Sequence, residues 1–251
     1  MVYGLSWGNV PEGFKRIGGD PRMMIVREDM ETYIDFTKFA EPPSVDEGLY
    51  GRGALAVHPL EDGGVLLVRR YRHGGALRAL TRDYFFTWPP RPFRELRLTE
   101  EAHRRGVPTV EPLAALVQRL IGPFYRGWLV TRQLKGARDL WAIAQADGFL
   151  AADKASCLEA AARAVRAMHR CGLDHRDLNL KNILLRREAG RWTGYVIDLD
   201  QSRLLHGAVP ADSAEKNLAR LERSVRKLDP GRRFLSAADW EHFLRSYREA
   251  G

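Results

Sequence analysis

The sequence has little cysteine and no long hydrophobic run. Its two cysteines, Cys157 and Cys171, are too few for a disulfide framework or a cysteine-based metal cluster, and they favour a reducing compartment. No stretch approaches the roughly 18 apolar residues that a membrane-spanning helix needs. The N-terminus lacks the basic and apolar regions of a signal peptide. We therefore expect a protein that is neither exported nor membrane-spanning.

Internal repeats and low-complexity tracts are also missing, and acidic residues are the minority. The 32 Asp and Glu residues face 40 Lys and Arg residues, which gives a formal net charge of +8. Such a surface favours nucleic acid, an acidic membrane face or phosphorylated small molecules as partners, and composition alone does not choose among them. With 45% apolar residues, the chain can bury a substantial core.

Strand patterns dominate the first half of the chain. The runs at 23–28 and 32–39 are candidate short strands, and Ala54–Val57 and Val65–Val68 flank a turn in the manner of a β-hairpin. A helix is expected at 91–106, because its composition is helical and it closes on a glycine before Pro108. Two further strand candidates follow, at Ala114–Leu120 and 127–134.

Helix patterns dominate the second half. Apolar residues recur at helical spacing in 153–172, 213–228 and 236–250, and a strand pair is expected at Ile183–Leu185 and Tyr195–Leu199. We therefore predict an α+β fold with two lobes that together form one domain. The predicted β-rich N-lobe is 1–131 and the α-rich C-lobe is 132–251.

The most informative motif begins at His175. His175-Arg176-Asp177-Leu178, followed by Asn182, matches the catalytic loop H-R-D-L-x-x-x-N of kinases at every fixed position. Asp198 follows the apolar run 195–197. Phosphoryl transfer needs a carboxylate at the acceptor hydroxyl and oxygen ligands for magnesium. Asp177 is the candidate catalytic residue, and Asn182 and Asp198 are the candidate metal ligands.

These residues, with segments from about 46 to 248, carry a resemblance to a known family. The stretches "HRCGLDHRDLNLKNILL", "VIDLDQSRL", "GLYGRGAL", "RRYRHGG" and "NLARLERSVRK" resemble the lipopolysaccharide kinases of Gram-negative bacteria, and most of all the members that phosphorylate Kdo. The resemblance implies a protein-kinase-like fold with ATP and Mg²⁺ between the lobes. It also implies Kdo on a lipid A precursor as acceptor, phosphorylated at its 4-hydroxyl.

The same resemblance places the nucleotide contacts. Three glycines precede the β-hairpin and would let backbone amides approach the phosphates: Gly48, Gly51 and Gly53. Protein kinases carry a lysine on the third strand, which is absent here. The resemblance gives that place to Arg69, with Arg70 as the alternative and Glu95 as the partner. Lys181 in the catalytic loop completes the nucleotide-binding candidates.

The segment after Asp198 is short. Leu199 and Asp200 replace the Phe-Gly of protein kinases, and about fourteen residues separate Asp200 from the next predicted helix, which favours a small or lipid-linked acceptor over a peptide. Asp200 itself is either a second metal ligand or a structural residue.

Basic and aromatic residues interleave from Arg69 to Trp88. Such a cluster suits nucleic acid or a phosphorylated, acylated lipid. With the kinase motif in the same chain, we expect the anionic cytoplasmic face of the inner membrane as partner, a peripheral cytoplasmic location, no nucleic acid and no obligate protein partner. The competing hypotheses are a heptose kinase of the same family, an atypical protein kinase and, outside enzymes, a basic nucleic-acid-binding module.

Overall fold

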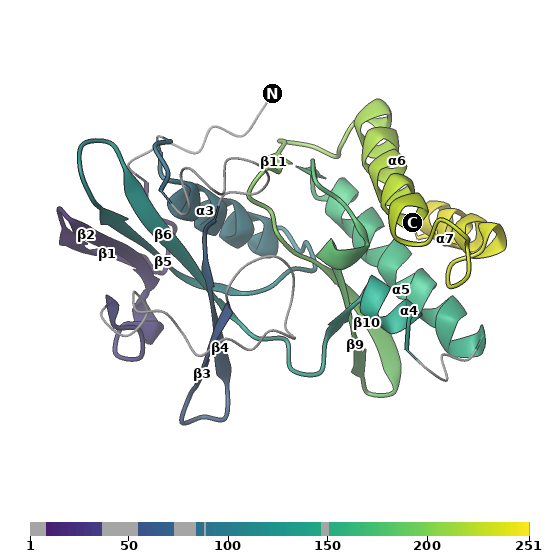
Figure 1. The fold of residues 1–251 in the computed structure, drawn as a ribbon, viewed down its shortest axis with the longest axis horizontal. Helices are drawn as coiled ribbons and strands as arrows, with labels where there is room; N and C mark the ends of the chain where they lie inside the picture. The colour runs from purple at the N-terminus through teal and green to yellow at the C-terminus, as the bar shows by residue number, and fades with distance from the viewer. Residues whose placement is uncertain (1–8, 37–54, 73–83, 88, 147–150, 251) are drawn as a thin grey trace. The chain divides into compact units, whose positions relative to one another are not determined.

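A computed structural model describes residues 9–36, 55–72, 84–87, 89–146 and 151–250. These residues divide into two compact units (Figure 1), and each is described by itself. We call 9–101 with 111–133 the sheet unit, and 102–110 with 134–250 the helical unit. The lobe boundary between residues 131 and 132 stays a prediction.

The sheet unit contains one antiparallel sheet. Its strand order is β1-β2-β5-β6-β4-β3. The strands are β1 (Phe14–Gly19), β2 (Arg22–Arg27), β3 (Leu55–Pro59), β4 (Val65–Arg70), β5 (Pro112–Arg119) and β6 (Tyr125–Arg132). The β3–β4 and β5–β6 hairpins confirm the strands predicted there, while β1 was not predicted.

The sheet is apolar on both faces. Neighbouring strand residues point to opposite faces, so Ala115 packs with the helix α3 (Arg91–Arg104) while Leu116 packs with Met30 and Ile34. Gly127 on β6 is required where the helix begins, because a Cβ there would lie 2.3 Å from Pro92 Cγ. Packing against this face of the sheet therefore fixes the position of α3, the helix that carries Glu95.

The strand expected at 32–39 is wrong in its described part, which ends at Phe36. A 3-10 helix η1 (Glu28–Met30) leads into a turn, and the Tyr33 and Ile34 amides donate to the Met30 carbonyl. Met30 and Ile34 are both buried, at the four-residue spacing of a helical turn. The alternating apolar residues that predicted a strand instead reach the core through this turn.

The helical unit packs four helices around two small sheets. The helices are α4 (Leu140–Ala144), α5 (Ala151–Arg170), α6 (Ala211–Leu228) and α7 (Ala237–Glu249). The strands are β7 (Arg138–Asp139), β8 (Leu173–Asp174), β9 (Ile183–Glu188), β10 (Arg191–Val196) and β11 (Arg203–Leu204), ordered β10-β9-β7 and β11-β8. The three long helices confirm the predicted pattern. Within the described residues, no helix is long and apolar enough to cross a bilayer.

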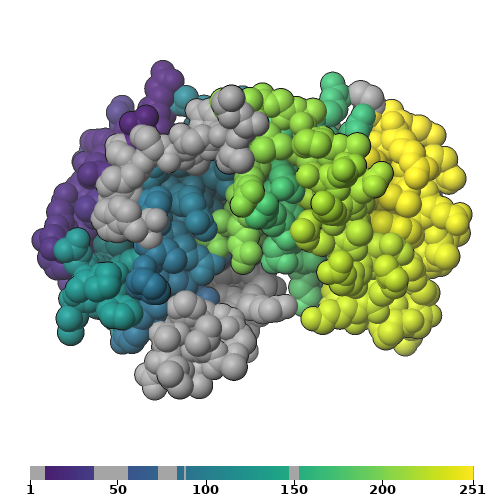
Figure 2. Space-filling view, turned by 90° about the horizontal axis from the view of Figure 1, so that it is seen from above, coloured from purple at the N-terminus to yellow at the C-terminus, as the bar shows by residue number. Residues whose placement is uncertain are grey.

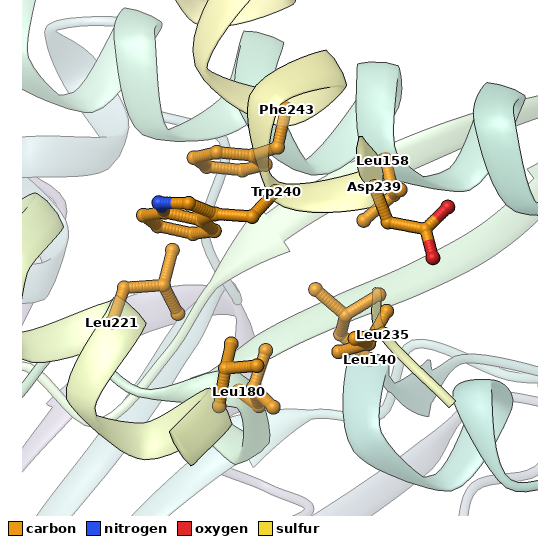
Figure 3. A pocket seen from close by; sticks show the side chains of 9 residues that line it. Leu140, Leu158, Leu180, Leu221, Leu235, Asp239, Trp240 and Phe243 are labelled. Atoms are coloured by element: carbon orange, nitrogen blue, oxygen red, sulfur yellow. The ribbon is translucent and has the colours of Figure 1, made fainter. Parts of the chain in front are cut away.

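Aliphatic and aromatic side chains from α4, α5, α6 and α7 meet around one small cavity (Figure 3). The helices α6 and α7 lie at the surface of this unit (Figure 2). Trp240 and Phe243 stack with ring centroids 5.1 Å apart, and Leu221 points toward the indole. The remaining cavity is only about 10 Å³. α6 is thereby held firmly against the rest of the unit.

Residues 102–110 join the helical unit through hydrogen bonds that involve its backbone. The Val196 amide donates to the Pro108 carbonyl at 2.8 Å, and Thr109 Oγ1 donates to the Val196 carbonyl at 2.6 Å. Arg105 donates to the Leu205 carbonyl at 2.5 Å. A segment distant in sequence thus borders β10, the strand that leads to Asp198.

Strand β10 ends at Val196, so the strand predicted to reach Leu199 is too long. The reason lies at Asp198, whose φ of 63° is in the left-handed region that extended strands exclude. The chain therefore turns at Asp198, the candidate metal ligand.

Candidate active site

The catalytic-loop residues lie between β8 and β9. Two side-chain amides, Asn179 Nδ2 and Asn182 Nδ2, each donate to the Asp177 carbonyl at 2.9 Å. The Asp177 side chain is exposed, while Asn182 is buried in the 3-10 helix η3 (Leu180–Asn182). The Asp177 backbone is therefore fixed while its carboxylate faces solvent, where an acceptor hydroxyl can reach it.

His175 ties this loop to the segment before Asp198. Its ring is fully buried, Nε2 lies 3.0 Å from the Ile197 carbonyl, and Nδ1 accepts from the Asp177 amide at 3.3 Å. Burial lowers the pKa of His175, which favours the neutral ring with the proton on Nε2. One side chain thus orients the backbone on both sides of the candidate site.

The two candidate metal ligands are brought together through the backbone. The Ile197 amide donates to the Asn182 carbonyl at 3.0 Å, which places Asp198 one residue away from that contact. Because Asn182 donates through Nδ2, its Oδ1 is left as an acceptor, and an amide oxygen with a carboxylate suits magnesium. No cluster of three His, Cys, Asp or Glu suited to a metal exists among the described residues. Magnesium bound largely by nucleotide phosphates does not need one.

The segment after Asp200 is packed against the helical unit. The Leu205 amide donates to the Gly172 carbonyl and the Val209 amide to the His169 carbonyl, at 2.9 and 2.8 Å. A Cβ at Gly172 would lie 2.4 Å from the Gly207 carbonyl oxygen, so only glycine permits this approach. The segment ends where α6 begins at Ala211 and forms no long peptide-binding loop.

The sheet unit brings Arg69 and Glu95 together. Arg69 Nη2 lies 2.5 Å from both Glu95 oxygens, and the Glu95 side chain is only 2% exposed. Tyr71 also donates to Glu95. Arg70 points elsewhere, with its guanidinium 5.7 Å from the Trp128 ring centre. The geometry therefore pairs Glu95 with the first of the two arginines, and their role in nucleotide binding stays a prediction.

The structure describes only some of the remaining candidate residues. Gly48, Gly51 and Gly53 lie outside the described residues. Lys181 is exposed, and its backbone amide donates to Asn179 Oδ1 at 3.0 Å. Asp200 is buried, at 5% exposed, unlike the half-buried Asp198.

Helix α6 supports the catalytic loop through two residues that the sequence reasoning missed. Asn217, fully buried, donates to Asp174 Oδ1 at 2.7 Å, and Ser224 Oγ accepts from the Leu180 amide at 3.1 Å. A signal existed for Asn217, because this polar residue interrupts the buried face formed by Ala214 and Leu221.

The chain is similar to the members of one known family. The model of the lipopolysaccharide kinase (Kdo/WaaP) family matches residues 44–247. A 3-deoxy-D-manno-octulosonic acid kinase of Xanthomonas campestris pv. campestris (strain B100) is 37% identical over 212 residues, covering 82% of this chain and 79% of that protein. The protein of the same name from Xylella fastidiosa (strain 9a5c) is 36% identical, covering 81% and 78%.

A solved structure shows the same fold. The structure described as WaaP in complex with acyl carrier protein aligns with a TM-score of 0.58 and 23% identity, covering 90% of this chain and 88% of that one. The predicted α+β, protein-kinase-like fold is confirmed, and the fold and catalytic loop define a kinase. More narrowly, the chain belongs to the lipopolysaccharide kinase (Kdo/WaaP) family. The predicted phosphotransferase class is confirmed at the level of this family.

Proposed function

We propose that this protein transfers the γ-phosphoryl group of ATP to the 4-hydroxyl of Kdo on a lipid A precursor. The observation that carries the proposal is how the catalytic loop is held: Asn182 Nδ2 donates to the Asp177 carbonyl, and the Ile197 amide, next to Asp198, donates to the Asn182 carbonyl. The family and the Kdo kinases similar to this chain support the choice of sugar. The packed segment after Asp200 supports a non-peptide acceptor.

In this mechanism Asp177 accepts a hydrogen bond from the acceptor hydroxyl and orients its oxygen toward the γ-phosphorus. As the new O–P bond forms, the bond to the ADP oxygen breaks and the hydroxyl proton passes to the Asp177 carboxylate. Asn182 and Asp198 would hold Mg²⁺, which when bound offsets the negative charge of the phosphates. Arg69, oriented by Glu95, would contact the nucleotide phosphates through its forked guanidinium.

The test is transfer of labelled phosphate from ATP with magnesium to Kdo-bearing lipid A and to the same lipid lacking Kdo. We expect label on the first lipid alone. The Asp177→Asn variant should lower kcat by about 10²–10⁴-fold while ATP binding is kept, because a positioned general base contributes that much. Asp212→Asn, which changes an exposed aspartate of α6, is the matched control.

Two outcomes would contradict the proposal. Unchanged turnover in Asp177→Asn would remove that residue from the reaction. Label on heptose-containing cores alone would keep the kinase chemistry and replace the acceptor.

We also propose that the enzyme works at an anionic membrane surface. In the described part of the sheet unit, four leucine, isoleucine or phenylalanine side chains are exposed: Phe86 at 71%, Leu120 at 36%, Ile121 at 84% and Phe124 at 48%. The Phe86 and Phe124 ring centres are 6.4 Å apart, so these two residues form one patch, and Ile121 lies in the same β5–β6 turn as Phe124. Apolar side chains beside basic ones suit the interface of an anionic bilayer, and the net charge is +8.

A further inference from the structure

A second candidate binding site lies in the helical unit. A surface cavity of about 380 Å³ is formed by the end of α5, the start of α6 and the end of α7. None of Asp177, Asn182 and Asp198 lines it. Its size is within the range of sites for small ligands.

Arginine dominates the charged lining. Arg166, Arg170 and Arg248 line the cavity, and none of the three has an ion-pair partner in the part of the chain that the structure describes. Arg166 lies over the Tyr247 ring, 5.3 Å from its centre, and its buried Nε has no hydrogen-bond partner among the described residues. Glu215 is the one carboxylate among the lining residues. The cavity therefore carries an excess of positive charge.

The positive charge of the cavity comes from the arginine guanidinium groups and not from the histidine that lies beneath them. His169 and Tyr247 are buried there and share a hydrogen bond of 2.8 Å. Burial lowers the pKa of His169 to about 4, so its ring is neutral at pH 7. The backbone amides at the N-terminus of α6, at Ala211, are not capped by a side chain and add partial positive charge to the wall, which Asp212 in the same turn partly offsets.

One wall of the cavity is apolar. Val209 is 8% exposed, and Leu218 and Leu244 are partly buried beside it. An inorganic anion would leave this wall unused. A ligand that joins a phosphate group to a short apolar segment matches both kinds of lining.

We propose that this cavity binds the phosphate group of an anionic amphiphile, with the phosphate on Arg166, Arg170 and Arg248 and the apolar part along Val209, Leu218 and Leu244. Arginine suits this ligand because its fork of donors matches phosphate oxygens. The inference does not depend on the proposed kinase activity, since the site shares no residue with the catalytic loop.

The experiment measures binding by calorimetry with the active site filled by magnesium and a non-hydrolysable ATP analogue. The probes are dihexanoyl phosphatidic acid, dihexanoyl phosphatidylcholine and inorganic phosphate. The Arg170→Gln/Arg248→Gln variant should raise the Kd for phosphatidic acid by about tenfold or more, because charge-assisted hydrogen bonds are lost. Both arginines are exposed, so folding should be preserved.

Matched controls separate the site from general surface charge. Arg163→Gln/Arg245→Gln removes two exposed arginines from the same helices outside the cavity, and its Kd should stay within about twofold. Glu215→Gln should tighten binding by about two- to fivefold, since it removes the opposing carboxylate. Glu241→Gln, exposed on α7 and outside the cavity, should not.

The possible results decide the proposal. Weaker binding in the cavity variant alone, with phosphatidylcholine and inorganic phosphate both binding more weakly than phosphatidic acid, supports it. Inorganic phosphate that binds as tightly as phosphatidic acid would make the site a plain anion site and overturn the amphiphile. Equal losses in the two double variants, or no binding of phosphatidic acid to the unmodified protein, would overturn the site.

Discussion

His169 joins α5 to α7 through Tyr247, and its burial makes folding sensitive to pH. The pKa of His169 falls from the ordinary 6.5 to about 4 in the folded protein. Between these values the unfolded chain binds more protons than the folded one, so stability is full above pH 6.5 and falls as the pH is lowered toward 4. We expect this residue to account for about 3 kcal/mol of that loss.

Urea unfolding at several pH values checks the expectation. His169→Gln should flatten the pH dependence in this window, whereas His103→Gln, an exposed histidine, should follow the unmodified protein. Parallel profiles for all three proteins would show that other groups cause the acid sensitivity.

At the same scale, the sequence identified the chemical groups but not what holds them. The spacing from Asp177 to Asn182 is local, so a motif can reveal it. The contact from Asn217 to Asp174 spans 43 residues, and the bridge from His175 to Ile197 spans 22. Such supports depend on which helix packs beside the loop, which only the folded chain determines.

Among the secondary-structure elements, β10 and α5 approach so closely that Gly194 has no room for a side chain. A Cβ there would lie 2.5 Å from the Ala160 carbonyl oxygen and 3.0 Å from Ala164 Cβ. Gly194→Ala must therefore push β10 away from the helix, at a cost of about 1–3 kcal/mol. Because β10 leads to Asp198, kcat should fall as well.

Thermal unfolding and phosphate transfer measure the two effects. Gly207→Ala is the matched control, since a Cβ there would contact nothing within 4 Å. A Gly194→Ala protein with unchanged stability would mean that α5 and β10 can separate without cost.

The long helices were predictable because the helical spacing of apolar residues can be recognised within each segment alone. Strands depend on partners elsewhere in the chain, and β1 is an edge strand whose residues 15–19 are partly or fully exposed. Its pattern was therefore weak. The strand predicted at 32–39 was wrong for a different reason. Around Ile34, a short helical turn buries apolar side chains that an alternating strand would also bury, so the pattern did not distinguish the two.

At the scale of the whole molecule, net charge and the exposed apolar patch predict binding to anionic vesicles. The protein should co-sediment with phosphatidylglycerol vesicles, and less so when salt rises and the Debye length shrinks. Ile121→Asp should weaken this binding by about tenfold, because an exposed aliphatic side chain that would enter the bilayer interface is replaced by a charge.

Tyr33→Asp is the control for that variant, since it adds the same charge at an exposed aromatic residue outside the patch. Equal weakening by both substitutions would attribute the binding to charge alone. Binding to neutral phosphatidylcholine vesicles of equal strength would argue against an electrostatic contribution.

The assignment of residues 102–110 to the helical unit has a consequence for recombination between relatives. Within the residues that the structure describes, the chain passes from one unit to the other at 101/102, 110/111 and 133/134, so no single crossover exchanges a complete unit. A chimera joined only at 133/134 would place one parent's Thr109 against the other parent's β10. Exchange of an intact unit requires 102–110 to be inherited together with 134–250, and within the described residues this takes three junctions, at 101/102, 110/111 and 133/134.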